Sequence, residues 1–324
     1  MKSLLTRYAA RTETLLDALR GERLHSGPVH VEAYLGYSTP DALVARGRVL
    51  SRPAHRADAE TPVEGLAESF RRFLTDEIAG VRVEAHGASA VTDEEGHFEL
   101  RLPRGACGGG DGPEEGWCSV PVVLPDHQTR TALPVRVPGE RAEFGIISDI
   151  DDTLIETGAW SLLRNLRTSL TGTVASRVVH ADAVRLLARL TEEGRNPVFY
   201  VSSSPWNLHP FLEAVLERGG LPMGPKFLRD FGLDESRLVT GTHTDHKGAS
   251  LDTVLAANPD LAFALVGDTG QHDADVYFHA IERHPGRIRS VHLRHAGRID
   301  SDDEQALERL RATGVPLHVG DRLE

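Results

Sequence analysis

Cysteine, basic charge and long apolar runs are all scarce in this chain of 324 residues. Its two cysteines, Cys107 and Cys118, are too few for a disulfide framework, and no CxxC or Cys/His cluster indicates a zinc site. We expect two reduced thiols, as in a reducing compartment. No apolar run approaches the roughly 18 residues that a membrane span requires, and residues 1–16 lack the continuous apolar region of a secretory signal. We therefore expect a cytoplasmic protein with no transmembrane segment.

The charge balance is acidic. The chain has 36 Lys and Arg residues against 48 Asp and Glu residues, a formal net charge of −12. This argues against a uniformly basic surface, so we expect no nucleic-acid partner, although a local basic patch stays open. Hydrophobic residues make up 40% and charged residues 26%, which is typical of a folded chain. The length allows about two domains.

The N-terminal segment, residues 1–26, is expected to be a helix. Over residues 2–24, leucines and Tyr8 recur at helical spacing, and basic side chains outnumber acidic ones. We expect this helix to pack on the protein itself. A helix lying on a membrane surface is the alternative, which the lack of Trp and Phe on its apolar face weakens.

Residues 27–141 read as a β domain. Apolar and polar residues alternate in several short runs between about 29 and 137, separated by Gly, Pro or Asp, which predicts an all-β sandwich of antiparallel strands. The turn from Thr92 to Phe98, in which Gly96 can adopt a positive φ, is expected to close a hairpin. It resembles the hairpin of transthyretin-like domains, which are usually structural or interaction modules.

After Arg141 the chain alternates between strand and helix patterns. The expected strands are residues 144–148, 197–202, 237–240, 262–267 and 288–293, and the expected helices are 162–170, 181–193, 207–218, 247–256, 273–283 and 302–313. Several of the strands are continuous apolar runs, as in strands covered on both faces. This order predicts a doubly wound parallel sheet over residues 142–324.

The chemistry is expected where these strands end, because ligands of open α/β sheets bind beyond the carboxyl ends of the strands. Asp149 and Asp151 follow the first strand, two residues apart, so their side chains lie on the same side of an extended backbone. Close like charges are costly unless a cation offsets them, and oxygen-only ligands favour Mg²⁺. Asp268 and Asp273 form a second acidic strand end.

Two further strand ends carry groups suited to an anion. Ser202 and Ser203 follow the second strand, just before Trp206 and Asn207, where hydroxyl and backbone N–H groups precede a helix. Lys247 stands at a helix start, a place the helix dipole disfavours for a cation, so we expect it to neutralise a phosphate. The H-x-x-H spacing of His243 and His246 is interpreted as local hydrogen bonding rather than as a zinc site.

The ordered set DxDxT, Ser, Lys and GDxxxxD resembles the haloacid-dehalogenase (HAD) phosphatase superfamily over about residues 142–295. The longer strings SDIDDT, FYVSSSPWNL and VGDTGQHDADVY resemble the catalytic domain of the actin-patch-associated phosphatidate phosphatase family and its bacterial relatives. Lys226 departs from that pattern, and we expect it to be solvated. The resemblance implies an α/β HAD-like doubly wound parallel sheet, preceded by the transthyretin-like sandwich and the N-terminal helix.

The resemblance also implies residue roles. Asp149 would be the nucleophile that forms an aspartyl-phosphate, and Asp151 the general acid and then the general base. Thr153 would hold that loop, while Ser202 and Lys247 would contact the phosphoryl oxygens.

The implied cofactor is Mg²⁺, held by the Asp149 carboxylate, the Asp151 carbonyl and Asp268. Asp273 would orient a metal-bound water or Lys247. Ser203, Trp206 and Asn207 would contact the substrate.

The implied reaction is hydrolysis of phosphatidate to diacylglycerol and phosphate, with the enzyme cytoplasmic or peripheral at a membrane. Residues 154–196 and 205–239 are too short for a large lid, and an open site suits a membrane-borne phosphomonoester. Apolar side chains at Trp160 and at leucines 162–170 form an apolar rim or ordinary helix core. Three alternatives stay open: a phosphatase for a soluble phosphomonoester or phosphoprotein, a phosphotransferase, and a catalytically retired lipid- or protein-binding module.

Overall fold

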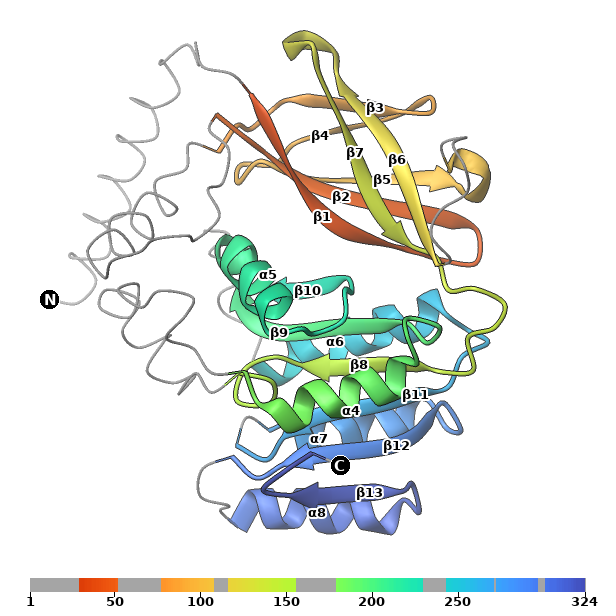
Figure 1. The fold of residues 1–324 in the computed structure, drawn as a ribbon, viewed down its shortest axis with the longest axis vertical. Helices are drawn as coiled ribbons and strands as arrows, with labels where there is room; N and C mark the ends of the chain where they lie inside the picture. The colour runs from red at the N-terminus through yellow and green to blue at the C-terminus, as the bar shows by residue number, and fades with distance from the viewer. Residues whose placement is uncertain are drawn as a thin grey trace, which may run out of the picture.

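The computed structural model describes residues 29–51, 77–107, 116–155, 179–229, 243–270, 272–296 and 301–323. Within them the chain forms two sheets, one above the other in Figure 1. The expected N-terminal helix, the expected helix at 162–170 and the expected strand at 237–240 lie outside the described residues. No helix in the described part of the chain is both long and apolar enough to cross a bilayer.

The first sheet is built by the alternating segments. Its strands are β1 (His30–Ser38), β2 (Ala42–Leu50), β3 (Arg82–Ala85), β4 (Ala88–Val91), β5 (His97–Pro103), β6 (Trp117–Leu124) and β7 (Thr129–Arg136). Short 3-10 helices, η1 (Arg104–Ala106) and η2 (Pro125–His127), follow β5 and β6. Alternate side chains of β5 and β6 are buried, which is the pattern of strands with one face against a core.

These strands make one mixed sheet instead of two stacked sheets. Their order is β4-β3-β6-β7-β1-β2-β5, with β1 and β7 parallel. The end strands β4 and β5 contact each other, so the sheet curls until it is nearly barrel-shaped. The turn before Phe98 forms, with Gly96 at φ 78°, but β4 and β5 stand at opposite ends of the strand order and do not pair as a hairpin. Alternation of apolar and polar residues shows that one face of a strand is buried. Strands of a sandwich and of a curled sheet both have one buried face, so the pattern could not distinguish the two folds.

The second sheet is parallel and has six strands. They are β8 (Gly145–Asp149), β9 (Val198–Pro205), β10 (Lys226–Arg229), β11 (Phe263–Asp268), β12 (Ile288–Arg294) and β13 (Leu317–Gly320), in the order β10-β9-β8-β11-β12-β13. Every residue of β8, β9 and β11 is buried, as expected for strands covered on both faces. The short edge strands β10 and β13 are elements that sequence reasoning missed.

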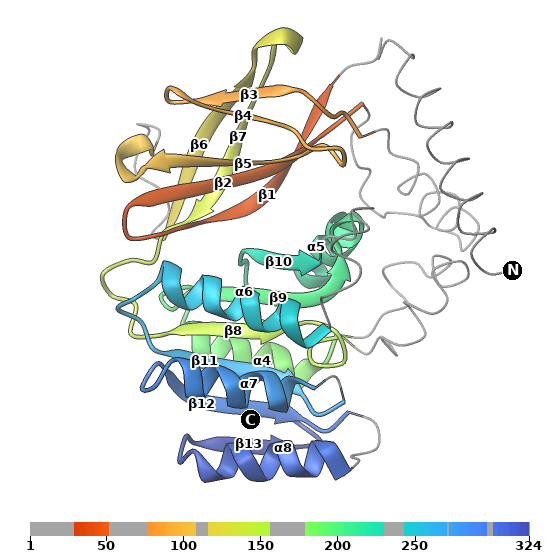
Figure 2. The ribbon, with the colours of Figure 1, turned by 180° about the vertical axis from the view of Figure 1, so that it is seen from behind.

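Helices cover both faces of this sheet (Figures 1 and 2). One face packs on α4 (Ala181–Thr191) and α5 (His209–Arg218), which follows the 3-10 helix η5 (Trp206–Leu208). The other packs on α6 (His243–Ala257), α7 (Asp273–Arg283) and α8 (Ser301–Ala312). The expected helices that fall within the described residues are confirmed to within a few residues.

The expected fold class is nevertheless wrong as a whole. The described chain is a nearly barrel-shaped mixed sheet and a parallel sheet with five α-helices, and it is neither a sandwich nor the HAD-like architecture that the resemblance implied. The resemblance rested on short motifs at strand ends. Such motifs say which side chains stand at the rim of a sheet, but not how the preceding strands close or how much helix surrounds them.

The cysteine prediction is also wrong. Cys107 and Cys118 form a disulfide, with their Cα atoms 5.5 Å apart. Cys107 follows η1, and Cys118 lies in β6 of the same sheet. Folding of the first sheet brings together two thiols whose sequence context showed no pairing motif.

Candidate active site

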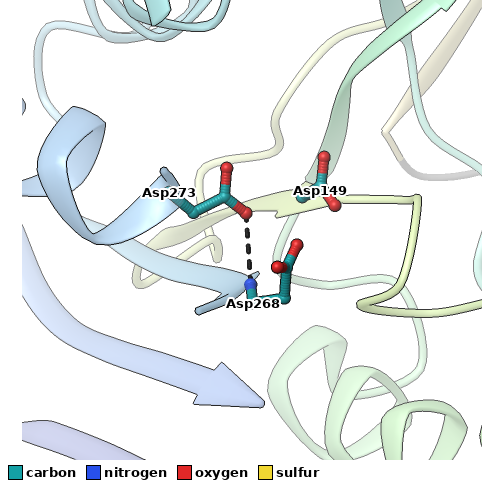
Figure 3. Close-up of side chains that lie close together, drawn as sticks. All are labelled: Asp149, Asp268 and Asp273. Atoms are coloured by element: carbon teal, nitrogen blue, oxygen red, sulfur yellow. Dashed lines mark hydrogen bonds between the residues drawn. The ribbon is translucent and has the colours of Figure 1, made fainter. Parts of the chain in front are cut away.

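Three buried aspartates converge at the carboxyl ends of two neighbouring parallel strands. Asp149 ends β8, Asp268 ends β11, and Asp273 is the first residue of α7 (Figure 3). One carboxylate oxygen from each lies within 4.8 Å of the others. Asp149 is 2% exposed, and the other two are fully buried. The strand-end argument thus located two acidic segments, 119 residues apart, that the sheet brings to one place.

Lys247 stands among these carboxylates. From the first turns of α6 its Nζ reaches Asp149 Oδ1 at 2.8 Å and Asp273 Oδ1 at 2.6 Å. The helix dipole disfavours a positive charge near the start of α6, and the two carboxylates offset that repulsion. The second oxygen of Asp149 is buried and has no hydrogen-bond partner in the described residues.

Backbone amides hold the other two aspartates in place. The N–H of Asp268 donates to Asp273 Oδ2 at 3.1 Å, the dashed line in Figure 3. Asp268 Oδ1 accepts from Gly270 N at 2.6 Å, and Thr153 Oγ1 lies 3.4 Å from Asp268 Oδ2. A Cβ at Gly267 would come within 2.6 Å of Asp273 Oδ2, so only glycine fits beneath this carboxylate.

Asp151 lies nearby but outside the three-aspartate cluster. Its Oδ2 accepts hydrogen bonds from Ser202 Oγ at 2.7 Å and from Ser204 Oγ at 2.9 Å, both from the end of β9. Ser202 Oγ in turn accepts from the N–H of Ser204 at 2.9 Å. Ser202 is therefore a partner of Asp151 in this structure, and Ser204 is a second partner that sequence reasoning missed. Its signal was the spacing of two along β9, which puts both hydroxyls on one side.

The remaining predicted contacts differ in surroundings. Ser203 is buried at the end of β9. Trp206, half-buried in η5, stacks on Tyr34 of the first sheet, with ring centroids 4.6 Å apart. Asn207 Oδ1 is buried without a hydrogen-bond partner among the described residues. Ser203 thus lies between the two serines that bind Asp151, and Trp206 and Asn207 follow shortly after them in the chain.

The solvated position expected for Lys226 is wrong. This side chain is 3% exposed and pairs with Glu213 of α5. Burial lowers the pKa of its ammonium. A lysine that opens an edge strand has no local signature of burial, because its cover comes from the first sheet and from α5.

Of the H-x-x-H segment, the described side chain of His246 does not join the three aspartates. His246 is half-buried near the start of α6, and burial lowers the pKa of its ring. The side chain of His243 lies outside the described part of the molecule. The described residues thus offer oxygen ligands alone at the cluster.

Arg294 is another residue that sequence reasoning missed. It ends β12, and its Nε donates to the carbonyl of Thr153 at 3.2 Å while Nη2 donates to Asp182 Oδ2 at 2.6 Å. The same strand-end rule that located Asp268 applied to β12. Arg294 was passed over because a lone basic residue carries little signal.

The electrostatics of the cluster are strongly perturbed. Burial raises the pKa of Asp149 well above its ordinary value, although Lys247 acts in the opposite direction. Burial and Asp273 raise the pKa of Asp268 to about 8. Burial alone would lower the pKa of Lys247, but Asp149 and Asp273 outweigh it and the net pKa is raised. Three carboxylates and one ammonium leave excess negative charge in a low-dielectric site.

This donor set fits a hard divalent cation. All three side chains offer carboxylate oxygens, and one oxygen of Asp149 lacks a hydrogen-bond partner in the described residues. Oxygen ligands of this kind are what Mg²⁺ prefers. Asp149, Asp268 and Asp273 are therefore the residues that could hold the ion.

Sequence comparison agrees with the motifs. Residues 144–295 match the family described as "Phosphatidate phosphatase APP1, catalytic domain". Phosphatidate phosphatase APP1 of Saccharomyces cerevisiae is 29% identical over 153 residues, which cover 47% of this chain and 26% of that protein. An uncharacterized protein of Schizosaccharomyces pombe is 28% identical over 159 residues, 48% of this chain and 26% of its own.

The chain spans about a quarter of the length of these curated relatives. Among solved structures, Bacteroides thetaiotamicron EndoBT-3987 in complex with its Man9GlcNAc2Asn substrate is 10% identical, with 89% of this chain and 85% of that one covered. Its TM-score of 0.19 supports no argument about this chain. The matched segment contains all three clustered aspartates and Lys247, so the part of the chain that carries the site, slightly less than half of its length, is similar to the phosphatidate phosphatase APP1 catalytic domain.

Proposed function

We propose that the chain is a Mg²⁺-dependent phosphatase that hydrolyses phosphatidate to diacylglycerol and phosphate through an aspartyl-phosphate on Asp149. The observation that carries this proposal is the buried Asp149 carboxylate beside Lys247, with one oxygen unpartnered in the described residues. The match of residues 144–295 to the APP1 catalytic domain supports the reaction class and the lipid substrate.

The first step is attack by the free Asp149 oxygen on phosphorus. A P–O bond forms to Asp149 while the bond to the glycerol oxygen breaks, and that oxygen takes a proton from Asp151. Lys247 serves this step because its ammonium favours the ionised form of Asp149, against the effect of burial.

The second step regenerates the enzyme. Asp151, now ionised, takes a proton from water as that water attacks the aspartyl-phosphate, and phosphate leaves with Asp149 restored. Hydrogen bonds from Ser202 and Ser204 hold the Asp151 carboxylate in one orientation for both transfers. Thr153 steadies the intervening loop through Asp268.

Asp149, Asp268 and Asp273 would hold the cation, with Asp273 also fixing Lys247. When bound, Mg²⁺ supplies positive charge that offsets the phosphoryl oxygens. The backbone carbonyl of Asp151 is a proposed further ligand, because the Asp151 carboxylate accepts hydrogen bonds from Ser202 and Ser204.

The proposed substrate places the enzyme at a membrane surface, as a peripheral protein. The apolar rim expected at residues 160–170 lies outside the described residues. The expected cytoplasmic location rests on three observations: reduced thiols, no apolar run long enough for a membrane span and no secretory signal. The Cys107–Cys118 disulfide removes the first of them. We therefore propose the membrane surface without a compartment.

Phosphate release from phosphatidate vesicles tests the proposal. Wild type with Mg²⁺ should release phosphate, EDTA should abolish the release, and Asp149→Asn should be inactive. Asp252→Asn, a half-exposed carboxylate of α6 paired with Arg283, is the matched control and should retain activity. Release from soluble esters but not from vesicles would reject the lipid substrate. A new phosphoester in place of free phosphate would indicate a transferase, and no turnover of any phosphomonoester would indicate a binding module.

A further inference from the structure

The first sheet contacts the segment that carries the Asp151 serines. Tyr34 of β1 stacks on Trp206, with ring planes 18° apart, and Trp206 follows directly after the last residue of β9. Ser202 and Ser204, which hold Asp151, therefore lie four and two residues before a side chain that the first sheet contacts. Figures 1 and 2 both show β1 and β2 beside the β9–β10 side of the parallel sheet.

A bulge in β1 allows a second tyrosine of this strand to contact the parallel sheet. Its register against β2 shifts between Tyr34 and Tyr37, so two tyrosines three residues apart face the second sheet. Tyr37 packs on Phe227 of β10, with ring centroids 5.4 Å apart, and belongs to the same apolar core as Phe199 and Val201 of β9. Without the bulge, alternation would turn one of the tyrosines away.

Arg46 of β2 adds a directed contact. Its Nη2 donates to the carbonyls of Leu35 at 2.9 Å and Lys226 at 3.1 Å, which ties β1 to β10. The guanidinium also lies over the ring of Trp206, 5.6 Å from its centroid. Arg46 thus reaches both the residue after β9 and the strand beside it.

β10 in turn restrains β9, because the two strands pair in parallel. Phe227 is in register with Val201, and Arg229 with Pro205, so the two paired positions bracket the Ser202–Ser204 segment. Buried polar groups add a contact between the two sheets: Nδ1 of His209 in α5 lies 3.9 Å from Oε1 of Glu32 in β1. The end of β9 is therefore held on both sides by residues that the first sheet contacts.

We propose that the first sheet is a positioning element for the reaction: Tyr34 and Arg46 hold Trp206 and β10 so that Ser202 and Ser204 keep Asp151 aligned. The inference rests on the proposed function, in which Asp151 protonates the leaving group. It gives the first sheet a role outside the segment that the family match covers, residues 144–295.

The kinetic test compares Tyr34→Ala, Tyr34→Phe and Leu100→Ala in the full chain. Leu100 is buried in the first sheet's own core and serves as a stability-matched control. With phosphatidate vesicles, whose leaving group needs a proton, Tyr34→Ala should lose roughly 10- to 100-fold in kcat with little change in KM. With 4-nitrophenyl phosphate, whose leaving group needs little protonation, the loss should be much smaller. Tyr34→Phe, which keeps the ring, should restore both rates.

Equal losses on the two esters, or an equal loss in Leu100→Ala, would overturn the inference, because both would reflect general destabilisation. Amide hydrogen exchange gives a second readout that needs no turnover. Tyr34→Ala should accelerate exchange at Ser202–Ser204, whereas Leu100→Ala should not, and unchanged exchange in Tyr34→Ala overturns the inference. An inactive wild type would reject the proposed function alone, and exchange would still decide whether the first sheet holds the end of β9.

Discussion

Asp151 accepts hydrogen bonds from two serine hydroxyls on one carboxylate oxygen, an arrangement that holds the carboxylate in one orientation. We expect Asp151→Asn to lower kcat on phosphatidate by about 10²- to 10⁴-fold, the usual worth of general acid–base catalysis. The amide keeps the size of the side chain and can still accept from a serine, so the fold should persist. Steady-state phosphate release, with Asp252→Asn alongside, checks this, and near-wild-type turnover would remove Asp151 from the mechanism.

Asp268 gives the metal-free protein a pH dependence. Burial and Asp273 raise its pKa to about 8, so between the unfolded value and that pH the folded state binds the proton more tightly than the unfolded chain does. The free energy of unfolding must then fall as pH rises through this window. In EDTA, we expect the Tm to fall between about pH 5 and pH 8, and to fall less steeply in Asp268→Asn. Equal slopes in the two proteins would contradict the assignment.

At the scale of elements, Arg294 joins β12, the Thr153 loop, the start of α4 and the C-terminal residues. Its three contacts are the carbonyls of Thr153 and Asp321 and the carboxylate of Asp182, and its side chain is 8% exposed. The substitution Arg294→Leu removes all three contacts and leaves the partly buried Asp182 carboxylate without its cation, so it should cost about 2–4 kcal/mol of unfolding free energy.

The matched control is Arg283→Leu. Arg283 pairs with Asp252 at a surface site where both side chains are about 40% exposed. An exposed pair of this kind contributes about 0–1 kcal/mol. Urea unfolding of both variants measures the difference, and similar losses would show that Arg294 does not act as a buried tie.

The elements themselves were largely predictable from local pattern. Continuous apolar runs located β8, β9 and β11, because strands covered on both faces have no polar side. Apolar residues at helical spacing located α4 and α7, because one face of each helix is buried. The edge strand β10 was missed, because four residues opened by a lysine show no period.

At the scale of the whole molecule, the first sheet has its own core but also contributes residues to a core of the second sheet. Tyr37 and Val44 of the first sheet pack in the same cluster as Phe199 and Phe227 of the second. We expect calorimetry to show one unfolding transition for the chain. Reducing the Cys107–Cys118 disulfide, which lies in the first sheet, should lower the Tm of that single transition, by an amount equivalent to about 3 kcal/mol for a short loop. Two separate transitions, or a shift confined to one of them, would show that the contact through Tyr37 and Val44 does not couple the two sheets.

The sequence by itself determined the positions of several side chains at the rim of the parallel sheet. Asp149, Asp268 and Lys247 could be placed there because the carboxyl ends of parallel strands meet, whatever surrounds them. Only the tertiary structure decided that the first seven strands curl into one sheet, that Lys226 is buried, that the two cysteines join, and that Tyr34 reaches Trp206. Each of these depends on partners far away in the chain, and a contact between distant segments leaves no periodicity in either of them.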